Sequence, residues 1–146
     1  MRFAEIPYDS PEYRMECDLR HVVLRLPLGM DLYDEDLTAE RHQRHFGLFL
    51  TDGTLGACAI AVSISADETK IRQMAVRTEL QGLGCGRFLM TRLQEILASD
   101  GVRHLSLHAR SNVAGFYKSL GFTQSGDEFI EVGIPHVKMV KAIPLE

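Results

Sequence analysis

The hydrophobic and polar positions of the N-terminal half predict a strand, a helix and a hairpin, in that order. Residues 2–6 are typical of a short strand, and residues 9–26 carry the signals of a helix. An N-cap, a proline at the first helical position and an acid in the first turn mark its start, at Ser10, Pro11 and Glu12. Pro27 and Gly29 are expected to end it. The polar residues 31–44 are predicted to hold a second short helix.

Two apolar runs, residues 45–50 and 55–64, flank the polar sequence Thr-Asp-Gly-Thr. This arrangement predicts two strands joined by a tight hairpin, in which Asp52 and Gly53 supply the positive φ angles of the turn. Residues 70–76 are typical of a further strand.

Apolar residues then recur at helical spacing, which predicts a helix from about Gly84 to Ser99. Gly101 is expected at its C-terminal cap. Its apolar face consists of Leu89, Leu93, Ile96 and Leu97. A shorter helix is expected at residues 111–122. Ser111 is its predicted N-cap and Gly121 its left-handed last residue, with Phe122 folding back on Phe116.

Residues 102–109 alternate between leucines and polar side chains, the period of a strand with two unlike faces. The polar positions are His104, Ser106 and His108. Residues 135–143 predict a closing strand that begins with Pro135. The order of elements indicates the α/β or α+β class, with a mixed sheet covered by helices. A chain of 146 residues suits a single domain, 1–146.

Composition narrows the possible functions. Hydrophobic residues make up 45% of the chain, yet no apolar run is long enough to span a membrane. A net charge of -4 argues against a nucleic-acid surface, which needs clustered Lys and Arg. Three cysteines without paired spacing, Cys17, Cys58 and Cys85, indicate reduced thiols. The N-terminus has no features of a secretory signal, so a cytoplasmic location is expected.

Three glycines, Gly82, Gly84 and Gly86, lie where the strand at 70–76 leads into the long helix. Bare backbone N–H groups at a helix N-terminus favour a phosphate ligand, and a Cβ would hold the anion away. Arg87 stands where a dinucleotide fingerprint has its third glycine, and the Lys of a phosphate-binding P-loop is absent. A tight turn without a ligand is the alternative.

Three segments resemble the GCN5-related N-acetyltransferase (GNAT) superfamily. The segment IRQMAVRTELQGLGCGRFLM is similar to its acetyl-CoA-binding segment, with Gln81, Gly84 and Gly86 on the Gln/Arg-x-x-Gly-x-Gly/Ala pattern. The segment FYKSLGF is similar to its Phe-Tyr-x-x-x-Gly-Phe signature. The segment EVGIPHVKM resembles the closing segment of a subgroup of mostly uncharacterised bacterial members, with the pattern GIPH-x-x-M. The three lie within residues 70–140.

The resemblance implies a mostly antiparallel central sheet flanked by helices, and acetyl transfer from acetyl-CoA to a primary amine by direct attack. It assigns the CoA diphosphate to the backbone amides of Gln81, Gly82, Leu83, Gly84, Cys85, Gly86 and Arg87. The pantetheine arm would pair with the main chain of Met74, Ala75 and Val76 as an added strand. Phe116 belongs to the signature beside the cofactor. Many members have Asn or Gln where this chain has Arg110, so Asn112 is the candidate for that contact.

The resemblance also makes Tyr117 the proton donor to the CoA thiolate. A tyrosine pKa of about 10 keeps the hydroxyl protonated at neutral pH. A buried Tyr117 that packs beside Val113 is the structural alternative. His108, at the end of its strand, and His136, expected on the loop before the last strand, are the candidate bases or substrate contacts. Glu128 and Glu131 are weaker candidates, and an ordered water is a further alternative.

No metal site is expected. His104 and His108 would lie about 13 Å apart at strand rise, and His42 and His45 show no further ligands nearby in the sequence. Cys85 at the helix N-terminus is interpreted as a small loop residue beside the cofactor, although such a position lowers a thiol pKa.

An acidic stretch between the first helix and the hairpin would attract a protonated amine, although a solvated loop explains it equally. Its members are Asp31, Asp34, Glu35 and Asp36. A small molecule or a protein amine is the expected acceptor, with a homodimer as a possible assembly and no nucleic-acid or membrane partner. The competing hypotheses are a non-catalytic acyl-CoA-sensing module and a structural protein without a cofactor.

Overall fold

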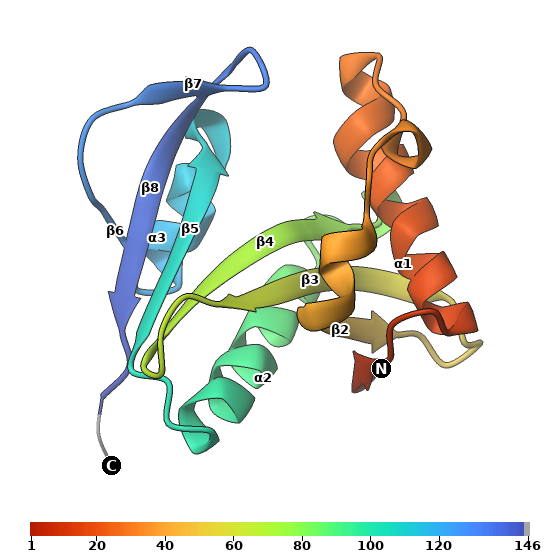
Figure 1. The fold of residues 1–146 in the computed structure, drawn as a ribbon, viewed down its shortest axis with the longest axis horizontal. Coiled ribbons are helices and arrows are strands. Elements are labelled where there is room, and N and C mark those ends of the chain that lie inside the picture. The colour runs from red at the N-terminus through yellow and green to blue at the C-terminus, as the bar shows by residue number, and fades with distance from the viewer. Residues whose placement is uncertain (145–146) are drawn as a thin grey trace.

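Eight strands form one sheet in the order β1-β2-β3-β4-β5-β8-β6, with β7 paired to β8. The computed structural model describes residues 1–144 (Figure 1). The strands are β1 (Arg2–Ile6), β2 (Arg44–Phe49), β3 (Leu55–Ser63), β4 (Glu68–Val76), β5 (His104–Arg110), β6 (Thr123–Gln124), β7 (Phe129–Glu131) and β8 (Ile134–Ala142). The α-helices are α1 (Pro11–Arg20), α2 (Cys85–Ser99) and α3 (Ala114–Ser119). This single-domain α/β fold confirms the predicted class.

Among the strands of residues 1–144, only β4 and β5 pair in parallel, and their pairing stops halfway along β4. The paired residues run from Glu68 opposite His104 to Ile71 opposite Leu107. Beyond this point β4 continues beside β3 to Val76, whereas β5 continues beside β8 to Arg110. The two strands therefore diverge, as Figure 1 shows.

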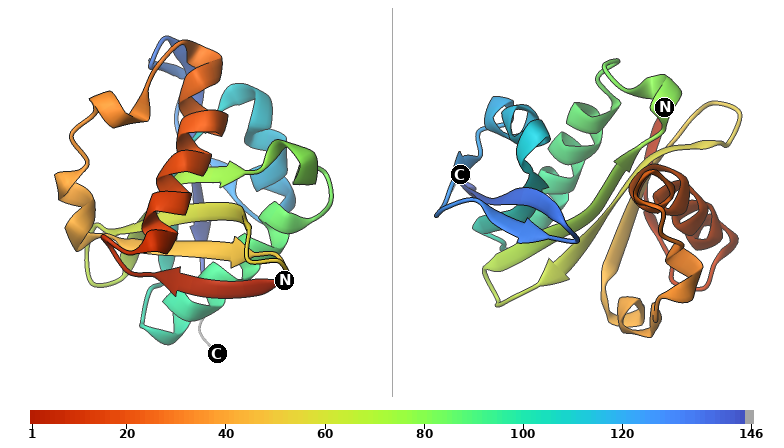
Figure 2. Two further views of the ribbon diagram at one scale, coloured as in Figure 1. Left: turned by 90° about the vertical axis from the view of Figure 1, so that its right-hand side faces the viewer. Right: turned by 90° about the horizontal axis from the view of Figure 1, so that it is seen from above.

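The two faces of the sheet have separate cores. Helix α1 packs on one face, with Cys17 and Leu19 against Cys58 and Ala75. Helix α2 packs on the other, where its predicted apolar face is buried at Leu89, Leu93 and Leu97 and half-buried at Ile96. Figure 2 shows the two helices on opposite sides of the strands. The sheet is thus covered on both faces. Helix α3 packs against strands β5 and β8.

Local signals set the ends of α1 as predicted. The Ser10 hydroxyl accepts a hydrogen bond from the Tyr13 amide at 3.1 Å, and Pro11 occupies the first turn. The helix continues as a π-turn (His21–Arg25) and a 3-10 turn (Leu26–Leu28), and Gly29 ends it with a φ of 70°. The second helix expected within 31–44 is replaced by two 3-10 turns, Leu32–Asp34 and Thr38–His42.

Several predictions about turns are wrong in detail. In the β2–β3 hairpin only Gly53 has a positive φ, of 89°, whereas the Asp52 carboxylate accepts from the Thr54 amide. Ser111 does not cap α3: it begins a 3-10 turn (Ser111–Val113), and its hydroxyl donates to Glu128. The Asp52 and Ser111 side chains therefore make hydrogen bonds that the sequence analysis did not predict.

The C-terminal region also differs from its prediction. The prediction that Phe122 folds back on Phe116 is wrong, because its ring packs edge-on against Tyr117, with ring centroids 5.8 Å apart. The short strands β6 and β7 were not predicted. Pro135 is the second residue of β8 and lies opposite Ile130 of β7. Among residues 1–144, none of the helices has the length and apolar character that a membrane crossing requires.

Candidate functional site

The loop before α2 presents free backbone amides at the N-terminus of a 15-residue helix. Gly82 and Gly84 have φ angles of 80° and 87°, and a Cβ at either would meet open space. The amides of Gln81 and Leu83 bond Thr78 and Leu80 within the loop, at 3.3 Å. Within the described residues, no protein acceptor bonds the remaining amides of the segment, which are those of Gly82, Gly84, Cys85, Gly86 and Arg87. These N–H groups can bind an anion.

Gly86 brings the candidate cofactor residues together. A Cβ at this position would lie 3.1 Å from Phe116 Cζ, 3.3 Å from Met74 Cε and 3.5 Å from Val76 Cγ2. The start of α2 therefore packs closely on the end of β4 and on α3. Three segments that are distant in the sequence meet beside the free amides.

The edge of β4 that faces β5 has no strand partner beyond Ile71 within residues 1–144. Its other edge is bonded to β3, where Ala75 lies opposite Cys58 and Val76 opposite Ala57. The register shifts near Gln73, which has a φ of 54°. An unpaired strand edge can accept an extended ligand as an additional strand.

Tyr117 lies in the hydrophobic core on the face of the sheet that α2 covers. It is 8% exposed and packs edge-on against Phe116 and Phe122, at 5.0 and 5.8 Å between ring centroids. Burial raises the pKa of Tyr117 to about 12, so the hydroxyl stays protonated at neutral pH. Val113, the partner in the structural alternative, is 42% exposed.

Other candidate residues occupy positions that sequence reasoning placed differently. Asn112 is exposed on the 3-10 turn before α3. The Cys85 side chain is buried at 3% and contacts Met1, so only its backbone can face the loop. The Arg87 guanidinium donates to the Ser119 hydroxyl at 2.9 Å, which joins α2 to α3.

The two candidate histidines meet at a single carboxylate, and we call His108, Glu131 and His136 the open cluster. His108 Nδ1 lies 3.1 Å from Glu131 Oε1, and His136 Nε2 lies 3.6 Å from Glu131 Oε2. His136 is buried in strand β8 and not, as expected, on the preceding loop. Its Nδ1 donates to the Ile134 carbonyl at 2.8 Å.

Glu131 was underrated by sequence reasoning. Partial burial alone would raise the pKa of Glu131, but the hydrogen bond from His108 and the electrostatic influence of the basic side chains His108, His136 and Lys70 hold this pKa below its usual range. The carboxylate is therefore ionised at neutral pH. The two-residue turn Val132–Gly133 folds β7 back on β8 and brings Glu131 towards His136, a signal readable in the sequence.

Most of the acidic stretch is engaged locally. The Asp31 carboxylate accepts from the Tyr33 amide, and the Asp36 carboxylate accepts from Thr38. Glu35 pairs with Arg25 at 2.6 Å, and Arg25 also donates to Gln73 of β4. These contacts bring the stretch close to the unpaired part of β4 but leave it less free negative charge than its composition indicates.

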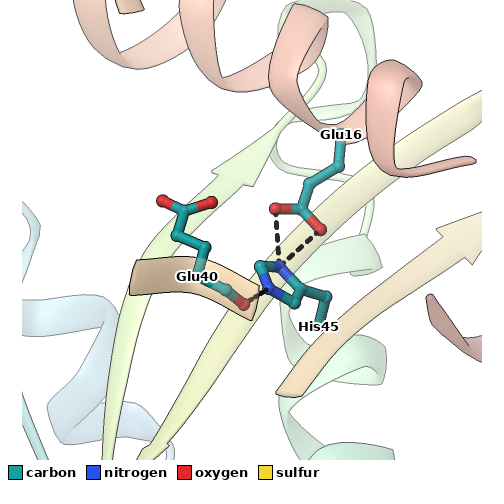
Figure 3. A group of neighbouring side chains, drawn as sticks. All are labelled: Glu16, Glu40 and His45. Carbon is teal, nitrogen blue, oxygen red and sulfur yellow. Dashed lines mark hydrogen bonds and ion pairs between the residues drawn. The ribbon is translucent and has the colours of Figure 1, made fainter. Parts of the chain in front are cut away.

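Three side chains of metal-ligating type gather between α1 and β2: Glu16, Glu40 and His45. His45 Nδ1 donates to both Glu16 oxygens at 3.0 Å, and Nε2 faces the Glu40 carbonyl at 2.9 Å (Figure 3). The prediction that His45 has no ligand-type neighbours is therefore wrong. Sequence reasoning missed this cluster because Glu16 lies 29 residues from His45 and reaches it only when α1 packs on the sheet.

A protein cation already neutralises these carboxylates. Arg20 NH1 donates to Glu16 at 2.9 Å and to Glu40 at 2.8 Å, and NH2 donates to Glu40 at 2.6 Å. The Tyr13 hydroxyl also donates to Glu40, at 2.7 Å. Both Glu40 carboxylate oxygens and one Glu16 oxygen are thus bonded to the guanidinium, and the other Glu16 oxygen is bonded to His45. We call Tyr13, Glu16, Arg20, Glu40 and His45 the buried network.

The diverging strand pair and the free N-terminus of α2 agree with what the resemblance to the GNAT superfamily implies. The family model of the acetyltransferase (GNAT) domain matches residues 30–143. The chain is 30% identical over 113 residues to YyaT, an uncharacterised protein of Bacillus subtilis, covering 77% of this chain and 75% of that protein. The chain belongs to the GNAT acetyltransferase family.

Solved structures share its fold. Escherichia coli ElaA superposes with a TM-score of 0.82 at 22% identity, over 97% of this chain and 99% of that one. An aminoglycoside 6'-N-acetyltransferase, solved in complex with coenzyme A, has a TM-score of 0.78 at 16% identity, over 100% and 99% of the two chains.

Proposed function

We propose that the protein transfers an acetyl group from acetyl-CoA to a primary amine. The observation that carries the proposal is the meeting, at Gly86, of free helix amides with the unpaired edge of β4. The free helix amides suit a diphosphate, and the unpaired strand edge suits the amide groups of a pantetheine arm. Their adjacency fits a ligand that contains both.

The free amides of Gly82 and of residues 84–87 would bind the diphosphate, because they lie at the positive end of the α2 dipole. The open space at Gly84 fits this role, since a side chain there would stand between the anion and the backbone. The main chain of Met74, Ala75 and Val76 would pair with the pantetheine arm. Phe116 would line the cofactor's path, and Asn112 is the candidate polar contact from the turn before α3.

Acetyl-CoA supplies an activated acyl group as a thioester. The neutral amine would attack the carbonyl carbon, so that a C–N bond forms and the C–S bond breaks. Tyr117 would protonate the departing thiolate, because burial keeps its proton in place. His108, with His136 nearby, is the candidate acceptor for the proton that the amine loses.

A pair of glycine substitutions tests the cofactor site. Gly84→Val should weaken acetyl-CoA binding at least about tenfold, because it displaces the loop amides. Gly101→Val is the matched control, since Gly101 also has a positive φ with open space around it, but at the other end of α2. Calorimetric titration of both variants with acetyl-CoA measures the difference. Equal affinities in the two variants would remove the proposed cofactor site.

Tyr117→Phe tests the chemistry. We expect kcat in a thiol-release assay with a broad amine panel to fall about 100-fold, with acetyl-CoA affinity unchanged. An unchanged kcat would remove the proposed role of Tyr117. The competing proposal, a non-catalytic acyl-CoA sensor, is favoured if acetyl-CoA binds tightly and no amine elicits CoA release.

The acceptor would be a small-molecule or protein amine that enters where β4 and β5 diverge. We also propose membership of the GIPH-x-x-M subgroup, on the segment that contains His136, and a homodimer as the assembly to test by light scattering.

A further inference from the structure

His108 lies where the sheet opens. Its neighbour Leu107 is the last residue of β5 that pairs with β4, so His108 is the first residue beyond the parallel pairing. The side chain is 30% exposed, which leaves part of the ring accessible. Phe129 holds the ring edge-on, at 5.0 Å between centroids. The ring is therefore fixed on one side and accessible on another.

The hydrogen bond to Glu131 decides which ring nitrogen carries a proton. An ionised carboxylate only accepts hydrogen bonds, so Nδ1 of His108 must donate to Glu131 Oε1 at 3.1 Å. In the neutral ring, Nε2 then has the free lone pair. This tautomer can accept a proton from an amine through Nε2.

His136 lies on the other side of the same carboxylate. Its Nδ1 donates to the Ile134 carbonyl, and its Nε2 lies 3.6 Å from Glu131 Oε2, which is beyond hydrogen-bond distance. Because His136 is only 5% exposed, its ring cannot move freely. The buried ring of His136 therefore limits the space available to the Glu131 carboxylate on that side.

Two lysines complete the electrostatic surroundings of the open cluster. Lys138 of β8 lies directly opposite His108 in the sheet, and Lys70 of β4 adds positive charge near Glu131. Glu131 is the negative group that offsets these two positive charges.

We infer that Glu131 is a positioning residue that orients His108 to take the proton of the attacking amine through Nε2. This inference rests on the proposed function and deepens it. When the amine attacks, its proton goes to Nε2, and the imidazolium that forms is stabilised by the adjacent carboxylate. Deprotonation by solvent then restores the neutral ring.

The test compares Glu131→Gln with Asp127→Asn, which removes the same charge from an exposed position in the same segment. The first readout is the pH dependence of kcat/KM for the amine. Glu131→Gln should lower kcat about 10- to 100-fold and move the acid limb of the profile to lower pH, with acetyl-CoA affinity unchanged. Asp127→Asn should leave all three unchanged.

The second readout needs no activity. Nitrogen-15 chemical shifts of the His108 ring should report a proton on Nδ1 in the parent protein and a mixture of tautomers in Glu131→Gln. The double variant His108→Asn/Glu131→Gln should be no slower than His108→Asn alone, because Glu131 acts through His108.

The outcomes separate the two claims. A parent protein that turns over no amine would overturn the proposed function and with it the catalytic part of this inference. A parent protein that is active, with kcat in Glu131→Gln within twofold or with its His108 tautomer unchanged, would overturn the inference alone.

Discussion

The molecule contains two clusters of histidine with glutamate, and they differ in what surrounds them. In the buried network, His45 and Glu16 are 1% and 0% exposed. Arg20 there binds the carboxylates of Glu16 and Glu40. In the open cluster, His108 and Glu131 are 30% and 45% exposed at the side chain, and no arginine bonds Glu131 within the described residues. In the buried network both ring nitrogens of His45 have a bonding partner. In the open cluster only Nδ1 of His108 has one within the described residues, and Nε2 is free.

The comparison teaches that residue type alone does not assign chemistry. The buried network connects α1, the 3-10 turn at Thr38–His42 and β2, so its bonds hold the first half of the chain together. Two cations face two carboxylates there, which balances the charge when His45 is protonated. The open cluster joins the tip of a hairpin to the end of β5, at the point where the sheet opens. We therefore expect substitutions to affect stability in the first cluster and catalysis in the second.

The largest effect is expected for Arg20→Met. This change leaves Glu16 and Glu40 buried without their common cation, which costs about 3–5 kcal/mol in such cases. Urea denaturation measures the loss in the free energy of unfolding. Arg92→Met is the control, because Arg92 forms an exposed pair with Glu95 at 3.5 Å. A cost below 1 kcal/mol for Arg20→Met would show that the network does not stabilise the fold.

His108→Asn should have the opposite effect, a loss of catalysis with little loss of stability. We expect kcat to fall about 100-fold, equivalent to about 2.7 kcal/mol in activation free energy, because the proton acceptor is lost. The free energy of unfolding should change by less than about 1 kcal/mol, since the side chain is partly exposed. Steady-state kinetics and urea denaturation on one preparation measure both. A large loss of stability with kcat preserved would contradict the comparison.

The pH dependence of the free energy of unfolding should reveal the contribution of the buried His45. Burial alone would lower the pKa of His45, but the hydrogen bond to Glu16 and the charge of that carboxylate raise it above its usual range. A raised folded-state pKa adds stability that is present below the unfolded value of about 6.5 and is lost as pH rises through the folded value. Denaturation from pH 6 to pH 9 should therefore show a decline that His45→Gln lacks. Parallel curves would show that His45 is neutral in the folded protein.

The smallest effect concerns the hairpin that carries Glu131. Val132 has a φ of 46°, a conformation that β-branched residues avoid and that asparagine tolerates. Val132→Asn should stabilise the protein by up to about 1 kcal/mol. Val132→Thr retains the branched side chain and should have no such effect. Thermal unfolding of the two variants would contradict this explanation if both shifted equally.

Elements with local causes were predictable. The free amides of the glycine loop follow from missing side chains and a helix start within a few residues, and the apolar face of α2 follows from its spacing. Local sequence also predicts the Ser10 cap and the glycines that follow helices, Gly29 and Gly101. The alternation of residues 102–109 predicts a strand with one polar face. The short strands β6 and β7 escaped prediction because each has only two or three residues and depends on β8 for its pairing.

By itself, the sequence determined where the backbone would bend, begin a helix or lack side chains, since those properties depend on neighbours a few residues away. Only the tertiary structure decided which charges meet. Glu131 reaches His108 across 23 residues and Arg20 reaches Glu40 across 20, and such contacts depend on how strands and helices pack. Packing placed Arg20 between one pair of carboxylates and left Glu131 to the histidines, because burial requires every charge to be balanced whereas partial exposure does not.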